Sequence, residues 1–295
     1  MITRFAPSPT GLLHLGHAFS ALTAYTRAQG AGGQFLLRIE DIDAPRCRPD
    51  FEQAIYDDLR WLGLEWQNPV LRQSERLDMY RDALDILNSQ GLTYPCSCTR
   101  ADIKAALSAP QEGSSQLGPD GLVYPGTCRD RPISEAQPND AMRLNMRKAV
   151  DALARAPRFH ETGPEMLGDH ELTKSHLINE VGDIVLSRKD IGTSYHIAVT
   201  VDDAAQEVTE VVRGMDLFPA TPIHVLLQHL LSLPTPTYHH HRLIRDDAGK
   251  RLAKRDDARA LETYRQAGKS ADDIRKMLGF QPIGAVSSIS RPSSI

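Results

Sequence analysis

The chain has 295 residues, and its 34 Lys and Arg against 38 Asp and Glu give a net charge of −4. This balance excludes a protein coated in basic charge for indiscriminate nucleic-acid binding, but it is compatible with a local basic groove. Hydrophobic residues at 41% and charged residues at 24% exclude a collagen-like or wholly disordered chain. No apolar run approaches the roughly 18 residues needed to cross a bilayer, and residues 1–10 lack the apolar stretch of a signal peptide. We therefore expect a cytoplasmic protein with no membrane contact.

The N-terminal part of the chain predicts alternating strands and helices. Apolar runs over residues 2–6 and 34–39 are typical of buried strands. Helical periodicity covers residues 14–30 and 50–62, and a further helix, beginning with a Ser cap, is expected over residues 74–91. Strand–helix–strand order is the pattern of an α/β domain with a parallel sheet.

The pattern changes at Tyr94, beyond which the chain is rich in Cys, Pro, Gly and Ser and lacks periodicity. We interpret residues 94–170 as an insert between residues 1–93 and 171–235, the two halves of the α/β domain. Alternating strands and helices resume in four segments: 183–187, a helix from Tyr195, 208–213 and 222–231.

The last part of the chain predicts less regular structure. Residues 236–280 are expected to hold a basic loop and then one helix, over residues 258–278. Residues 281–295 are small and polar, and we expect a disordered tail there. The run His239-His240-His241 is interpreted as a solvated turn, because no Cys or carboxylate cluster accompanies it.

Two segments near the ends of the predicted domain carry groups that suit a polyphosphate. His14-Leu15-Gly16-His17 follows a strand and a Pro/Gly turn and opens a helix, where free N–H groups and the helix dipole attract phosphate. Gly16 lets a ligand lie against the backbone, and the two imidazoles can donate hydrogen bonds to phosphate oxygens. Arg251-Leu252-Ala253-Lys254-Arg255 brings several cations that can neutralise a polyphosphate. Taken singly, these segments also suit two surface histidines and a solvated basic turn.

In this order, the two segments resemble the two signatures of class I aminoacyl-tRNA synthetases. Three further motifs are similar to the glutamyl-tRNA synthetase group: residues 4–11 (RFAPSPTG), 38–43 (RIEDID) and 212–216 (VRGMD). The resemblance implies an α/β fold with a Rossmann-type catalytic domain, and a reaction between L-glutamate and ATP with Mg²⁺. It implies catalytic roles for His14, His17 and Lys254, and ATP contacts from these three residues together with Gly16 and Arg251.

A glutamate substrate presents an ammonium and two carboxylates, so its site must supply charges of both signs. Glu40, directly after a predicted strand, can pair with the ammonium. Arg4 and Arg213 can each form two hydrogen bonds with a carboxylate, and Tyr195 can donate its hydroxyl. Taken alone, the charged residues also suit an ordinary ion pair, and Tyr195 suits core packing. The resemblance implies a glutamate pocket of eight residues: Arg4, Phe5, Ala6, Pro7, Ser8, Glu40, Tyr195 and Arg213.

Three of the four cysteines, Cys96, Cys98 and Cys128, lie in the predicted insert. Three thiolates that converge favour Zn²⁺ and need a fourth ligand for a closed tetrahedral site, whereas the alternative is three unrelated buried thiols. The spacing leaves three candidates for the fourth ligand: Tyr124, His160 and His170. The resemblance implies that Tyr124 joins the three cysteines around one structural zinc ion, which must lower the pKa of the phenol.

Forty-one residues follow Lys254, which is too few for the anticodon-binding domain that a discriminating glutamyl-tRNA synthetase carries there. This layout, with its cysteine-bearing insert, resembles the glutamyl-Q tRNA(Asp) synthetases. The resemblance implies that the glutamyl group passes from an adenylate to queuosine at the wobble position of tRNA(Asp). It also implies a monomer.

Three alternative functions remain: a compact glutamyl-tRNA synthetase that charges the 3′ end of tRNA(Glu), an enzyme that activates glutamate for an acceptor other than tRNA, and an inactive synthetase paralogue that serves as a binding module. An inactive paralogue has no reason to retain all the residues of both signatures. Two positions depart from the family pattern. Ile42 stands where Thr is common, and Ala253 stands where the basic loop usually has Ser, so any hydroxyl contact there is missing.

Overall fold

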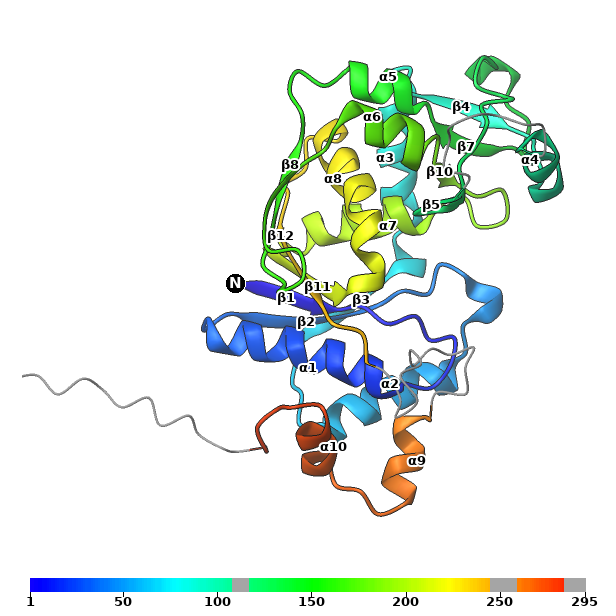
Figure 1. The fold of residues 1–295 in the computed structure, drawn as a ribbon. Coiled ribbons are helices and arrows are strands. Elements are labelled where there is room, and N and C mark those ends of the chain that lie inside the picture. Colours follow the sequence, from blue (N-terminus) through cyan, green and yellow to red (C-terminus); the bar gives the residue numbers. More distant parts are fainter. Residues whose placement is uncertain (108–116, 245–258, 284–295) are drawn as a thin grey trace, which may run out of the picture.

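The computed structural model describes residues 1–107, 117–244 and 259–283. Its N-terminal part is a three-stranded parallel sheet in the order β1-β2-β3. The strands are β1 (Ile2–Phe5), β2 (Gln34–Ile39) and β3 (Gln67–Arg72). Helices α1 (Leu15–Gly30) and α2 (Pro49–Trp61) connect consecutive strands and lie on one face of the sheet (Figure 1). The predicted strand–helix–strand order is confirmed.

A four-stranded sheet in the order β11-β12-β8-β9 continues this layer. Its strands are β8 (Arg158–Glu161), β9 (Gly168–Glu171), β11 (Glu210–Gly214) and β12 (Thr237–His241). Strand β11 lies beside β1, since the Thr209 N–H donates to the Ile2 carbonyl at 3.0 Å. Strands β11, β12 and β8 run parallel, and β9 is antiparallel to β8. Strand β8 therefore pairs with β12, although its residues fall in the range expected for the insert.

Helices α3 (Leu77–Ser89), α7 (Tyr195–Ala205) and α8 (Thr221–Leu230) share one apolar core with the second sheet. The predicted helix start at Tyr195 is confirmed. Helix α3 begins later than expected, because Ser74 lies in a 3-10 turn before it. The N–H and the hydroxyl of Ser74 donate instead to the carboxylate of Asp41, at 2.8 and 2.7 Å. The Ser cap predicted for this helix is therefore wrong.

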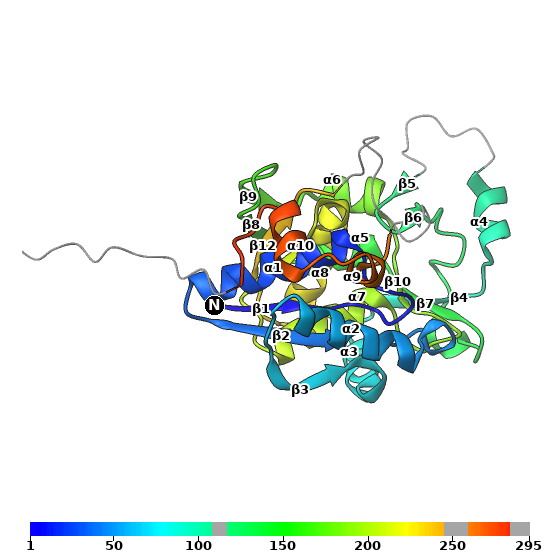
Figure 2. The same cartoon turned by 90° about the horizontal axis from the view of Figure 1, so that it is seen from below.

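A separate antiparallel sheet, in the order β10-β7-β4, lies at one side of the molecule with the hairpin β5-β6 and helix α4 (Figures 1 and 2). The strands are β4 (Thr93–Cys96), β5 (Leu117–Gly118), β6 (Gly121–Leu122), β7 (Ala141–Leu144) and β10 (Val185–Ser187), and the helices are α4 (Arg100–Leu107), α5 (Met146–Asp151) and α6 (Lys174–His176). Short 3-10 turns span Ala44–Arg46, Gln73–Glu75, Ile133–Glu135 and Met215–Ala220, and a π-helical turn spans Leu177–Val181. Strand β10 was expected to resume the parallel pattern, but it pairs antiparallel with β7.

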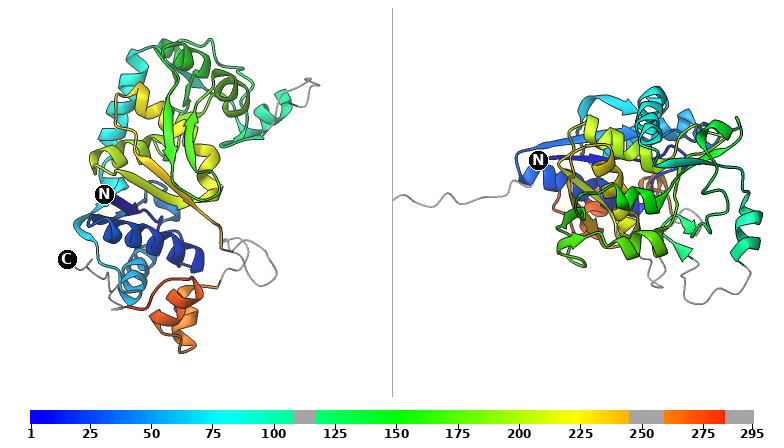
Figure 3. Two further views of the ribbon diagram at one scale, coloured as in Figure 1. Left: turned by 60° about the vertical axis from the view of Figure 1, so that its left-hand side comes forward. Right: turned by 90° about the horizontal axis from the view of Figure 1, so that it is seen from above.

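The single helix predicted over residues 258–278 is wrong, because two helices stand there: α9 (Leu261–Gln266) and α10 (Ala271–Met277). Gly268 between them has φ +78°, a left-handed conformation that ends the first helix. Ser270 and Asp273 then form a capping box that starts the second. Both helices lie beside α1 and α2 (Figure 3). No helix among the described residues is long and apolar enough to span a membrane.

The histidine run 239–241 is not a solvated turn, as the sequence suggested, but the end of strand β12. This strand lies between β11 and β8, and His240 and His241 are buried. A strand inside a parallel sheet is covered on both faces, so polar side chains there need partners within the protein. The partners of His240 are Glu161, Arg213 and Thr221.

Candidate active site

A cavity of about 430 Å³ opens where the chain leaves β1, β2 and β11 and enters α1. Ligands of parallel sheets collect at such strand ends. Every predicted glutamate-pocket residue lines it, as do the residues of the first signature that are predicted to bind phosphate: Arg4, Phe5, Ala6, Pro7, Ser8, His14, Gly16, His17, Glu40, Tyr195 and Arg213. The structure thus brings together predicted residues from distant parts of the sequence, such as Arg4 and Arg213. Arg251 and Lys254 lie outside the described residues.

The two signature histidines cap α1 and fix each other. The Gly16 N–H donates to His14 Nδ1 at 3.1 Å, and the His14 N–H donates to His17 Nδ1 at 3.2 Å. The two rings stack with their centroids 3.7 Å apart. A neutral imidazole has one donor and one acceptor, so both rings carry their hydrogen on Nε2. The first turn of α1 therefore combines two imidazole donors with its own positive dipole end, which suits an anion.

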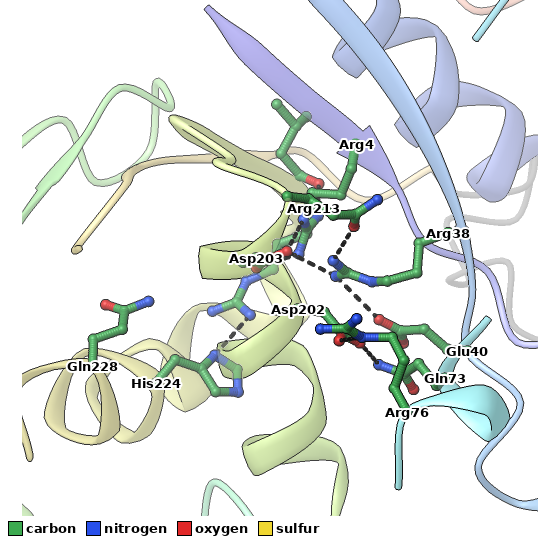
Figure 4. Close-up of polar contacts among 12 residues, drawn as sticks. Arg4, Arg38, Glu40, Gln73, Arg76, Asp202, Asp203, Arg213, His224 and Gln228 are labelled. Carbon is green, nitrogen blue, oxygen red and sulfur yellow. Dashed lines mark hydrogen bonds and ion pairs between the residues drawn. The ribbon is translucent and has the colours of Figure 1, made fainter. Parts of the chain in front are cut away.

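Beside the cavity lies a cluster of two arginines and two acids from β1, β2, the residue that follows β2, and α7, of which Arg4 and Glu40 line the cavity (Figure 4). Arg4 donates from Nε and Nη2 to Asp203, at 2.8 and 3.2 Å, and Arg38 Nη2 lies 2.8 Å from the same carboxylate. Arg38 Nη2 also lies 3.5 Å from Glu40. Arg4 was expected to present two N–H groups to a substrate carboxylate; three of its five N–H groups bind within the protein, two to Asp203 and one to the Val212 carbonyl.

Burial and charge act oppositely on the two acids of this cluster. Burial raises the pKa of Glu40 to about 6, and the attraction of Arg38 and Arg4 only partly offsets it. Burial also opposes ionisation of Asp203, but Arg4 and Arg38 outweigh it and lower the pKa of that carboxyl. Asp203 is therefore ionised at neutral pH, whereas Glu40 changes its charge near pH 6.

Arg213 differs from Arg4 and Arg38 because its partners are all neutral. Its Nε donates to His240 at 3.0 Å, Nη1 lies 3.0 Å from His224, and Nη2 donates to Thr221 at 2.8 Å. Within residues 1–107, 117–244 and 259–283, no carboxylate pairs with Arg213, although its side chain is only about 5% exposed. An unpaired buried charge is costly. The arrangement therefore suits an anionic ligand in the cavity.

Two more cavities adjoin the first. One of about 270 Å³ lies beyond Glu40, and one of about 840 Å³ reaches toward the insert. Tyr195 lines all three, and Leu217 lines both the first and the largest. Burial raises the pKa of Tyr195, so its hydroxyl stays protonated and can donate a hydrogen bond.

Cys96, Cys98 and Cys128 converge, with their sulfur atoms all within 4.8 Å of one another. Of the three candidates for a fourth ligand, Tyr124 lies among these sulfurs: its hydroxyl is 3.4 Å from Cys96 Sγ and 3.3 Å from Cys98 Sγ. His160 instead contacts Asp169, and His170 contacts the carbonyl of Met166. Three soft sulfur donors and one oxygen, in a buried cluster, are a donor set that fits Zn²⁺.

Sequence reasoning missed several residues of the site. Asp203 carried a signal, since two adjacent acids in the otherwise apolar segment 197–205 need buried partners. Its neighbour Asp202 indeed binds Arg76, Gln73 and Tyr80. His224 carried none, because a histidine in a mostly apolar helix does not reveal its partner.

Comparisons with known proteins agree with this geometry. The family described as "tRNA synthetases class I (E and Q), catalytic domain" matches residues 1–283. A relative from Rhodobacter capsulatus, named glutamyl-Q tRNA(Asp) synthetase, is 60% identical over 95% of this chain and all of its own length. A relative of the same name from Nocardia farcinica is 43% identical over 93% of this chain and 82% of its own length.

Solved structures show the same fold. A glutamate-tRNA synthetase from Elizabethkingia anophelis superposes with a TM-score of 0.74 at 24% identity, covering 94% of this chain. The match spans only 61% of that longer protein. A methionyl-tRNA synthetase from Mycobacterium tuberculosis shares the fold at a TM-score of 0.57 and 8% identity. The chain therefore belongs to the class I tRNA synthetases (E and Q), as a catalytic domain with mixed α/β architecture.

Proposed function

We propose that the chain activates L-glutamate with ATP and transfers the glutamyl group to queuosine in tRNA(Asp). Buried Arg213, with no carboxylate partner in the described part of the chain, supports an amino-acid substrate that brings its own carboxylates. Glu40, in the same cavity, supplies the opposite charge for the ammonium. The names of the relatives support queuosine-bearing tRNA(Asp) as the acceptor.

The first step joins glutamate to ATP. A glutamate α-carboxylate oxygen attacks the α-phosphorus, the bond to the β-phosphate oxygen breaks, and pyrophosphate leaves. Catalysis then rests on alignment and on neutralisation of the phosphate charge. Nε2–H groups of His14 and His17 and the N-terminus of α1 bind phosphate oxygens, and Gly16 lets the nucleotide lie close to the backbone. Bound Mg²⁺ adds positive charge at the triphosphate.

In the proposed function, Arg251 and Lys254 add further positive charge at the ATP phosphates. One flank of residues 245–258 lines the cavity, and the other pairs with a residue that does. Ile244 lines it, and Ala260 forms a backbone bridge with His14, the cap of α1. This anchoring supports phosphate contacts from the two cations, whose own positions lie outside the described residues.

In the second step a hydroxyl of queuosine's cyclopentene ring attacks the glutamyl carbonyl. The new ester forms, AMP leaves, and the hydroxyl proton passes to solvent. The cavity of about 840 Å³ adjoins the glutamate pocket at Tyr195 and Leu217 and has room for a base. We further propose that Cys96, Cys98, Tyr124 and Cys128 hold one zinc ion, which would stabilise the insert.

Two assays test this function separately. Pyrophosphate exchange with ATP and glutamate, without tRNA, measures activation, and an absence of exchange refutes it. Labelled glutamate is then offered to tRNA from cells with and without queuosine. Labelling confined to the queuosine-bearing pool supports the proposed acceptor. Equal labelling of both pools, or charging at the 3′ end, favours a compact glutamyl-tRNA synthetase instead.

A further inference from the structure

Buried groups behind the cavity form one continuous hydrogen-bonded chain across five elements. It consists, in order, of Glu161, His240, Arg213, His224 and His196, all less than 10% exposed. His240 Nδ1 contacts Glu161 Oε2, and His240 Nε2 lies 3.0 Å from Arg213 Nε. On the other side, His224 Nδ1 lies 3.0 Å from Arg213 Nη1, and His224 Nε2 lies 3.2 Å from His196 Nδ1. Figure 4 shows His224 meeting the Arg213 guanidinium.

Arg213 sets the direction of every bond in this chain, because a guanidinium only donates. His240 must accept at Nε2, so its hydrogen is on Nδ1 and is donated to Glu161. His224 must accept at Nδ1, so its hydrogen is on Nε2 and is donated to His196. His196 in turn carries its hydrogen on Nε2, which faces the Asp120 carboxylate at 3.4 Å. One arginine thus fixes the tautomers of three histidines.

Neutral acceptors take three of the five N–H groups of Arg213. The third acceptor is Thr221, whose Oγ1 accepts from Nη2 at 2.8 Å and can donate to His240 Nε2 at 3.2 Å. Among the described residues, one N–H on each Nη has no hydrogen-bond acceptor, and Arg213 lines the cavity. Two N–H groups of one guanidinium can bind the two oxygens of a carboxylate.

The charges of the chain agree with these roles. Burial and the neighbouring Arg213 hold the pKa of His224 well below its usual value, and burial lowers the pKa of His240. Both rings are therefore neutral at pH 7 and able to accept. Burial opposes ionisation of Glu161, but hydrogen bonds from His240 and Gly163 lower its pKa. The one acid among these five hydrogen-bonded residues is therefore ionised, but the imidazole of His240 separates it from Arg213.

We propose that His224 and His240 are positioning residues, which orient Arg213 as neutral acceptors and leave its positive charge for a carboxylate of the substrate. The contrast is Arg4, which lines the same cavity but belongs to a cluster in which Asp203 and Glu40 balance the charges of Arg4 and Arg38. A carboxylate acceptor at position 224 would orient Arg213 equally well but would cancel its charge. The inference rests on the proposed function only in taking glutamate as the ligand.

A pair of substitutions separates orientation from charge. His224→Asn places an amide oxygen near the position of Nδ1, and His224→Asp places a carboxylate there with the same shape. We expect His224→Asn to keep the KM for glutamate within about threefold of the wild type in pyrophosphate exchange. We expect His224→Asp to raise the KM for glutamate at least tenfold and to leave the KM for ATP unchanged. On the same helix, His229→Asn and His229→Asp serve as controls that leave both constants unchanged.

Equal KM values for glutamate in the two His224 variants would overturn the inference, since a merely structural role does not distinguish them. At position 240, His240→Gln should rescue glutamate affinity relative to His240→Leu, and equal losses would count against the role of His240. A wild-type protein that neither binds glutamate calorimetrically nor supports exchange refutes the proposed function instead.

The tautomers of the histidines can be tested in the wild-type protein, without any substitution. In ¹⁵N-histidine spectra of the wild type at pH 7, we expect the hydrogen of His240 on Nδ1 and the hydrogen of His224 on Nε2. An imidazolium at either position, or the opposite tautomer, would overturn the inference.

Discussion

Arg4 and Arg213 line the same cavity, but only the first of these two arginines is paired with a carboxylate in the described part of the chain. Asp203 binds Arg4 and Arg38 together, and with ionised Glu40 beside Arg38 the two acids balance the two guanidiniums before any ligand arrives. Arg213 is held instead by imidazoles and a hydroxyl. The two arginines therefore have different tasks: the first supports the structure of the site, and the second carries the charge that a substrate carboxylate can meet.

Removal of Asp203 tests the structural half of this division. Asp203→Asn would leave two buried guanidiniums without their shared anion, and breaking a buried pair in this way costs about 3–5 kcal/mol. Urea denaturation should show this loss of unfolding free energy. Asp78→Asn, which breaks an exposed pair with Arg81, is the matched control and should change stability by less than about 1 kcal/mol. Equal effects of the two substitutions would show that the cluster does not stabilise the fold.

Ligand-induced stabilisation tests the role of Arg213. A ligand present at a hundred times its Kd stabilises the folded state by about 2.7 kcal/mol. We expect glutamate to raise the Tm of the wild type and to have no effect on Arg213→Gln at the same concentration. ATP should still stabilise the variant, because its binding residues on α1 are untouched. A variant that responds fully to glutamate would exclude Arg213 from the glutamate pocket.

The elements around the site were predictable because their signals are local. Apolar runs, a Pro/Gly turn and helical periodicity located β1, α1 and β2. The buried hydrogen-bonded chain was not predictable, because Glu161, Arg213 and His224 meet only through the pairing of β8, β12 and β11 and the packing of α8. His240 was even misinterpreted, since three consecutive histidines resemble a polar turn unless the flanking strands that bury them are known.

The pH dependence of glutamate binding tests Glu40. Its pKa of about 6 means that the carboxyl is ionised at pH 7 and becomes neutral as the pH falls through 6. The ionised form pairs with the substrate ammonium, so kcat/KM for glutamate should fall up to tenfold per pH unit below about pH 6. Because burial raises this pKa from 4.5 to about 6, the stability contributed by the neutral carboxyl is fully present below about pH 4.5 and is lost as the pH rises through 6. Glu40→Gln should remove the inflection; an unchanged pH profile in this variant would assign it to another group.

Metal analysis tests the cysteine cluster. We expect about one zinc ion per chain and a lower Tm after chelation, because a structural zinc site contributes directly to folding. Tyr124→Phe and Cys98→Ser should lose zinc more readily than the wild type, whereas Cys47→Ser, outside the cluster, should retain it. Fully folded protein purified without metal would contradict the site.

Lys254→Ala tests the proposed phosphate contact of the basic loop. If Lys254 neutralises charge that develops as pyrophosphate leaves, its removal should lower the exchange rate about a hundredfold, as is usual for the loss of one group that stabilises a transition state. The calorimetric Kd for glutamate should stay unchanged, because the proposed glutamate contacts are made by Glu40 and Arg213 and not by Lys254. Lys269→Ala, between α9 and α10, is the matched control for loss of one cation and should leave the rate unchanged. Exchange that is equally fast in Lys254→Ala and the control would remove this loop from the mechanism and leave His14 and His17 as the phosphate ligands.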